Sequence, residues 1–122
     1  MRAARWAVIA IGLIAAAPAL ADDAFDTCRG AGGAEKDCGE QWIGREQGRV
    51  DAIWREITNL TEGKVSADLA VEQRAWEAFR DTSCAFKLDD GFGEADGYYA
   101  CRAEVISSRA RMLDAYLKYI DN

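Results

Sequence analysis

Residues 73–84 read QRAWEAFRDTSC, and this stretch decides the fold because a helical pattern leads directly into a cysteine. Trp76 and Arg80 lie four residues apart, so an indole and a guanidinium can share one helix face. Phe79 continues the same pattern, which predicts that both aromatic rings belong to a core. We therefore expect Arg80 to fold over that core and to be held by an acid. An exposed recognition surface is the alternative.

The N-terminal segment has the pattern of a secretory signal peptide. Arg2 and Arg5 give it a positive start, and residues 6–17 form an apolar run too short for a stop-transfer helix. Residues 19–21, Ala-Leu-Ala, supply a small-x-small cleavage site. We expect cleavage after Ala21. An uncleaved membrane anchor is the alternative.

This cleavage assigns residues 1–21 to the signal peptide and residues 22–122 to one mature domain, in the periplasm or secreted. The signal peptide holds two of the fifteen basic residues and none of the 21 acidic ones, so the mature domain carries a formal charge of −8. Such an acidic domain is a poor match for nucleic acid or an anionic membrane surface. It suits a soluble protein, or one that binds a cationic partner.

The mature domain contains four cysteines, at positions 28, 38, 84 and 101. An even number in a small exported domain indicates two disulfides. Zinc binding is the alternative, but no two cysteines have C-x-x-C spacing and the sequence contains no histidine. We therefore expect two disulfides, no metal and no cofactor.

The spacing of apolar residues predicts three helices with short connections. The first covers about residues 37–60, after an irregular, glycine-rich lead-in over residues 22–36. The second follows Ser66, a good N-cap, and runs to about residue 86. The third begins near residue 94 or 95 and runs to about residue 120.

Each predicted helix carries an apolar stripe that we expect to face the core. In chain order the stripes are Trp42, Ile43, Val50, Ile53, Trp54, Ile57 and Leu60, then Leu69, Trp76, Phe79 and Phe86, then Tyr98, Cys101, Val105, Met112, Tyr116 and Tyr119. Three helices with short connections predict an all-α fold, a small up-down-up bundle.

This topology brings the cysteines to one end of the bundle. Cys38 starts the first helix, Cys84 ends the second and Cys101 lies early in the third, while Cys28 can reach the same end. Three pairings remain possible. We favour Cys28–Cys38 with Cys84–Cys101 because both close short loops, and a loop of roughly 15 residues is worth about 3 kcal/mol.

The sequence offers little for catalysis. Without histidine, neither a Ser-His-Asp nor a Cys-His arrangement can form, and oxidised cysteines supply no thiolate. In the predicted loop at residues 87–96, the acidic stretch 89–96 suggests calcium, but its spacing does not fit an EF-hand, so a solvated loop is the default. We expect a protein that is not an enzyme.

The chain resembles a family of bacterial exported domains similar to the lysozyme inhibitor LprI. The segment at 73–84 matches the family pattern Gln-Arg-x-Trp-x-x-aromatic-Arg-Asp-x-x-Cys, and the other cysteines and the last helix match as well. The matching residues outside the cysteines, which we expect to be structural, include Gln73, Arg74, Trp76, Phe79, Arg80, Asp81, Arg109 and Leu113.

This resemblance implies a periplasmic or secreted binding protein that blocks a cationic lysozyme by occlusion. Candidate contacts with the partner are four acids of the predicted loop, Asp89, Asp90, Glu94 and Asp96. One alternative is a non-catalytic accessory module of the cell envelope without lysozyme activity. Another is a small-ligand binder that uses the aromatic residues of the bundle.

Overall fold

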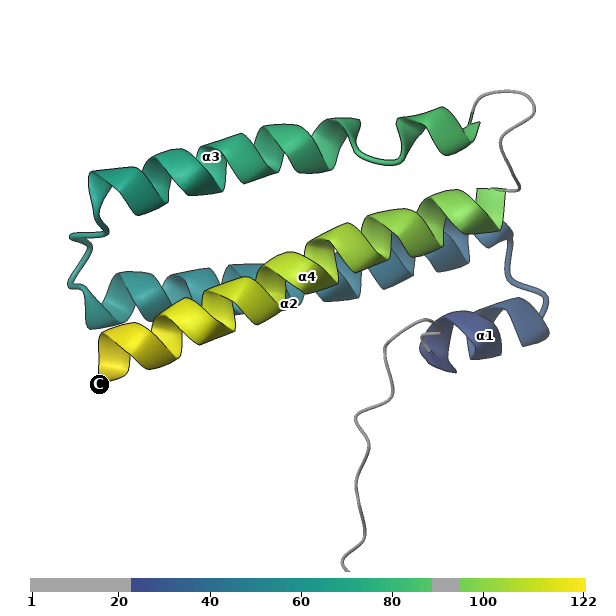
Figure 1. Ribbon diagram of the computed structural model, residues 1–122. Helices are drawn as coiled ribbons and strands as arrows, with labels where there is room; N and C mark the ends of the chain where they lie inside the picture. The colour runs from purple at the N-terminus through teal and green to yellow at the C-terminus, as the bar shows by residue number, and fades with distance from the viewer. Residues whose placement is uncertain (1–22, 89–94) are drawn as a thin grey trace, which may run out of the picture.

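The computed structural model describes residues 23–88 and 95–122, and every regular element in these ranges is helical (Figure 1). Three long helices alternate in direction, with α3 antiparallel to α2 and α4. The all-α class is confirmed. The expected number of helices is wrong, because the lead-in forms a helix of its own. The elements are α1 (Asp23–Gly30), α2 (Glu35–Leu60), α3 (Ala67–Thr82), the 3-10 helix η1 (Ala85–Leu88) and α4 (Ala95–Asp121).

The extra helix, α1, occupies the stretch expected to be irregular. Asp23 and Asp26 lie in its first turn and Arg29 in its last, so these charges complement the helix dipole. Phe25 packs on Trp42 of α2, with ring centroids 5.1 Å apart. The glycines that suggested an irregular segment lie at the end of α1 and beyond it, where they stop the helix without interrupting it.

Two disulfides hold one end of the bundle. Cys28 is bonded to Cys38 and Cys84 to Cys101, with Cα–Cα distances of 5.7 and 5.9 Å. The favoured pairing is therefore confirmed, and Figure 1 shows that α2 and α4 start at the end where α3 finishes. The first bridge requires a glycine at position 33, because a Cβ there would lie 2.6 Å from the Cys28 carbonyl oxygen and from the Cys38 Sγ.

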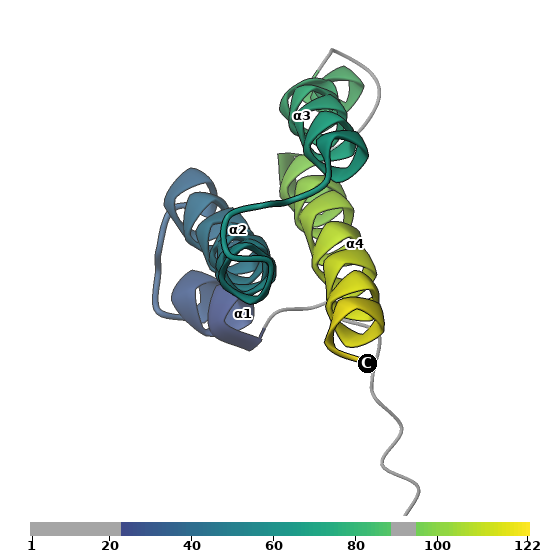
Figure 2. The same cartoon turned by 90° about the vertical axis from the view of Figure 1, so that its left-hand side faces the viewer.

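The core lies between α2 and α4, which run side by side (Figures 1 and 2). The apolar stripe predicted for α2 is buried at Trp42, Val50 and Ile57, although Leu60 is 46% exposed. The main cluster of buried side chains comprises Val50, Ile57, Ile106, Ala110, Leu113 and Leu117. A second cluster near the disulfides comprises Trp42, Tyr99 and Ala103.

The face of α4 that packs on α2 differs from the predicted stripe. The buried apolar residues are Tyr99, Ala103, Ile106, Ala110, Leu113 and Leu117, whereas Tyr119 of the predicted stripe is 88% exposed. The predicted stripe includes Val105 and Met112, which lie on the neighbouring side of α4, toward α3. A helix with two adjacent apolar sides gives an ambiguous pattern, and the small alanines of the buried side weaken its signal further.

Helix α3 begins as predicted but ends early. The Ser66 side chain accepts a hydrogen bond from the Leu69 backbone N–H at 3.2 Å, which caps the helix. The helix stops at Thr82 because Cys84 takes a left-handed conformation, with φ of 69°, next to its disulfide. The expectation that Phe79 faces the core is wrong, since its side chain is 59% exposed. Phe86, now on η1, is 56% exposed.

Two glycines of α2 give a matched test of this packing. A Cβ on Gly39 would overlap the Tyr99 ring, whereas a Cβ on Gly48 would meet nothing within 4 Å. Gly39→Ala should therefore lower the free energy of unfolding by about 1–3 kcal/mol through overpacking. Gly48→Ala should raise it by about 0.5–1 kcal/mol, because alanine is the better helix former. Urea denaturation measures both, and equal midpoints for the two variants would contradict the packing of Tyr99 on α2.

Candidate functional site

Two family-motif residues from different helices meet at a buried guanidinium. Arg109 on α4 is 3% exposed, and its Nε and Nη2 both donate to Oε1 of Gln73 on α3, at 3.0 and 2.8 Å. Within α3, all of which the structure describes, Gln73 is the one buried side chain. A buried guanidinium needs acceptors for its N–H groups. Arg109 therefore fixes the position of α3 on α4.

Glu72 completes this junction at the surface. Arg109 Nη1 donates to Glu72 Oε1 at 2.6 Å, and the Tyr116 hydroxyl donates to the same oxygen at 3.1 Å. The hydrogen bond from Arg109 lowers the pKa of Glu72 against a smaller opposing effect of desolvation, and the bond from Tyr116 lowers it further. Desolvation, followed by the bond to Glu72, raises the pKa of Tyr116. The ionised carboxylate is thus the form that joins α3 to α4.

Two guanidiniums lie close to the Trp76 ring. The Cζ of Arg80 is 5.3 Å from the Trp76 ring centroid and the Cζ of Arg109 is 5.8 Å from it. Arg80 also donates to Asp81 and to Gln47 of α2, both at 2.9 Å. Arg80 therefore folds over an aromatic ring and is held by an acid, in the arrangement favoured from the sequence. Trp76 itself is only partly buried.

The remaining motif residues divide between core and surface. Leu113 is fully buried between α2 and α4. Arg74 and Phe79 are exposed on α3. The motif thus includes side chains that the packing of the helices uses and an exposed aromatic ring that it does not.

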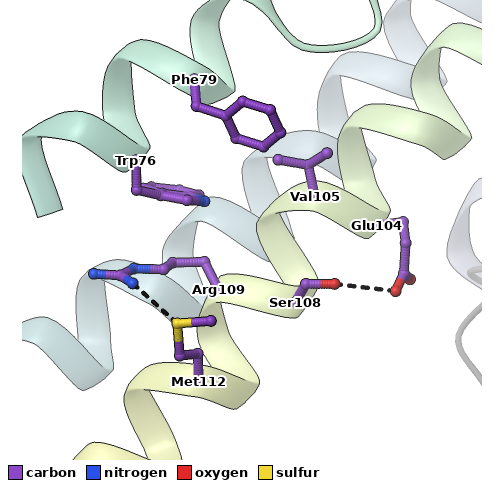
Figure 3. A pocket seen from close by; sticks show the side chains of 7 residues that line it. All are labelled: Trp76, Phe79, Glu104, Val105, Ser108, Arg109 and Met112. Atoms are coloured by element: carbon purple, nitrogen blue, oxygen red, sulfur yellow. Dashed lines mark hydrogen bonds between the residues drawn. The ribbon is translucent and has the colours of Figure 1, made fainter. Parts of the chain in front are cut away.

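A trough follows the seam between α3 and α4, and its central part is a cavity of about 310 Å³ (Figure 3). Trp76 and Phe79 project into it from α3, opposite the side chains of α4. A second cavity of about 350 Å³ shares Phe79 and Val105 and extends toward the Cys84–Cys101 bridge. We call the two together the α3–α4 trough. Its lining comprises Trp76, Phe79, Thr82, Ser83, Cys84, Phe86, Cys101, Glu104, Val105, Ser108, Arg109 and Met112.

A further cavity of about 320 Å³ lies by the start of α3, away from the disulfides. Glu72 and Tyr116 line it together with Tyr119 and Ile120. The Arg109–Glu72 junction thus lies between this cavity and the α3–α4 trough.

The acids proposed as partner contacts are not part of this geometry. Asp89, Asp90 and Glu94 lie outside the described residues. Asp96 belongs to the first turn of α4, but its side chain is also outside the described part. These four residues remain predictions from the sequence.

Sequence reasoning did not single out Glu72, Glu104 or Ser108. Glu104 and Ser108 are four residues apart on α4 and are joined by a hydrogen bond of 3.2 Å. Residues four apart share a helix face, so this polar pair beside the apolar Val105 could have indicated a side of α4 that is part polar and part apolar. Nothing in the sequence pairs Glu72 with Arg109, since the two are 37 residues apart.

The described ranges, 23–88 and 95–122, contain no group of three or more side chains placed to ligate a metal ion. They also contain no helix with the length and apolar character needed to span a membrane.

Comparison with known proteins gives one positive finding. A family model described as lysozyme inhibitor LprI matches residues 28–113, which is more than half of the chain. The search of curated proteins and the search of solved structures gave no match.

The guanidinium junction predicts a large difference between two arginines of α4. Arg109→Lys should lower the free energy of unfolding by about 2–4 kcal/mol, because a lysine cannot reproduce the bonds to Gln73 and Glu72. Arg111, which is 56% exposed and paired with Glu104, is the matched control. Arg111→Lys should cost about 0.5 kcal/mol or less. Equal losses in urea denaturation would show that Arg109 does not hold α3 in place.

The carboxylate of Glu72 predicts a dependence of stability on pH. Its pKa is lower in the folded than in the unfolded protein, so its stabilising effect is present above the usual value of 4.5 and is lost as the pH falls through the folded pKa. Glu72→Gln should remove this part of the acid-induced loss. The exposed Glu56→Gln on α2 is the control for loss of one charge. Thermal melting between pH 7 and pH 3 tests this, and parallel pH profiles for the wild type and Glu72→Gln would contradict it.

Proposed function

The chain belongs to the LprI family of lysozyme inhibitors, and on this basis we propose that it is an exported protein that binds a cationic lysozyme and blocks its active site by occlusion. The observation that carries the proposal is the extent of the match. Residues 28–113 include both disulfides, all of α2 and α3, and α4 as far as Leu113. The match therefore covers the helices that build the α3–α4 trough.

Charge supports a cationic partner. The proposed mature domain has a formal charge of −8, so long-range attraction would increase its rate of association with a basic enzyme. Such attraction weakens as salt rises, since the screening length is about 8 Å at physiological ionic strength. Charge accounts for fast encounter, and the tight fit that inhibition needs must come from close contacts.

Inhibition by binding requires no catalytic group in this chain. The four cysteines are all in disulfides, so they offer no thiolate. The lowered pKa of the Glu72 carboxyl has a structural explanation, because Glu72 holds Arg109. We therefore propose a non-enzymatic role, without metal or cofactor.

Export is the remaining part of the proposal. Residues 1–21 would direct the chain out of the cytoplasm and be cleaved after Ala21, which places the mature domain in the periplasm or outside the cell. An oxidising compartment agrees with the two disulfides.

The oxidised mature domain should inhibit a cationic egg-white lysozyme. In an assay that follows the clearing of a cell-wall suspension, inhibition should saturate at a fixed molar ratio and persist near 0.15 M salt, although the affinity falls as salt increases. Binding without saturation would indicate general electrostatic adhesion. Full lysozyme activity at a large molar excess would contradict the proposal and favour a non-catalytic module of the cell envelope.

A further inference from the structure

We propose that the α3–α4 trough is the surface that docks on lysozyme, and that it receives an apolar side chain flanked by basic residues. This inference rests on the proposed function and identifies the part of the chain that makes the contact.

The trough exposes apolar surface that the fold does not use. Phe79 is 59% exposed, Phe86 56% and Met112 47%, and all three line it. Helix α3 is held by the polar bonds of Arg109 and by the Cys84–Cys101 bridge, so these apolar side chains contribute little to holding the bundle together. Aromatic rings and methionine are enriched at the centres of protein interfaces, where few residues supply most of the affinity.

Two ion pairs that involve α3 place their carboxylates outward, and Arg109 of one of them lines the trough. In the Arg109–Glu72 pair the guanidinium is 3% exposed and the carboxylate 44%, and in the Arg80–Asp81 pair the values are 23% and 62%. At these two pairs an approaching molecule therefore meets acidic oxygens before it meets the arginines beneath them. Outward carboxylates beside an apolar recess are complementary to a partner surface on which basic side chains surround an apolar side chain.

Two cations contact residues that line the trough. Arg111 is bonded to Glu104, and Lys87 lies 5.7 Å from the centroid of the Phe86 ring at the disulfide end. Since Arg111 already neutralises Glu104 and Lys87 lies at the disulfide end, we expect the basic residues of the partner to lie near Glu72.

The size of the central cavity favours a side chain as its occupant. At about 310 Å³ it is at the lower limit of the range typical of small-molecule sites, about 300–1,000 Å³. Its walls are fixed by the disulfide and by the Arg109 junction, so docking would require little ordering. A rigid apolar recess with acidic margins fits a protruding residue on a folded basic protein.

The test compares variants of the oxidised mature domain that differ in one exposed apolar side chain. Phe79→Ala and Met112→Ala truncate the trough, while Val71→Ala truncates a side chain of α3 that is 55% exposed and outside the trough. Calorimetric titration with egg-white lysozyme should show Kd raised about tenfold or more by each trough variant. Val71→Ala should leave Kd within about twofold of the wild type. Melting temperatures control for loss of folding.

A second measurement identifies the surface without relying on mutation. Amide resonances of the labelled domain should shift around Phe79, Val105 and Ser108 when lysozyme is added. Shifts confined to the ends of α1 and α2 would overturn the inference.

The outcomes separate this inference from the proposed function. If the wild type inhibits lysozyme and all three variants inhibit equally, the trough is not the contact surface and the proposed function stands. If neutralising Asp89, Asp90 and Glu94 together abolishes binding while Phe79→Ala does not weaken it, the contact is the acidic segment predicted from the sequence. If Phe79→Ala instead converts a wild-type dimer to a monomer without affecting inhibition, the trough is occupied by a second copy. If the wild type binds no lysozyme, the proposed function itself fails, and this inference with it.

Discussion

The burial of Arg109 is the constraint on which the arrangement of α3 depends. A guanidinium that is 3% exposed cannot remain without acceptors, and on α4 Arg109 donates to the Met112 sulfur at 3.2 Å. The carboxamide of Gln73 and the carboxylate of Glu72 provide the oxygens, and both are on α3. Because these contacts are polar and directional, they set the position of α3 without requiring that its apolar residues be covered. The trough beside Trp76 is a result of this polar attachment.

The long helices could be predicted from the sequence because their apolar spacing extends over many turns. The first predicted helix, 37–60, agrees with α2 to within two residues, and the last agrees with α4 equally well. The end of α3 could not be predicted in this way, since it depends on Cys84 taking a left-handed conformation beside its partner. The choice of buried face on α4 also failed. Ala103 and Ala110 have little apolar surface, so they contribute weakly to a hydropathy pattern even though they are buried against α2.

The candidate site was only partly visible in the sequence. The motif indicated Gln73 and Arg109, and the order of the helices brought α3 beside α4, but their mutual hydrogen bonds depend on the rotation of each helix about its axis. The position of Phe79 could not be predicted from the sequence either. Its spacing from Trp76 predicted a core residue, but Leu69 and Trp76 pack against the core cluster while the Phe79 ring stays exposed.

The connectivity of the disulfides has a consequence for how the chain matures. Each bridge joins a cysteine to the next one along the sequence, and the two closed loops, with separations of 10 and 17 residues, neither overlap nor enclose one another. A chain that emerges N-terminus first and is oxidised as it appears will therefore meet its native partners in order. The first bridge can close before α3 has emerged, and the second closes as α4 begins. Oxidation in the order of synthesis leads directly to the native pairing, without thiol–disulfide exchange to correct it.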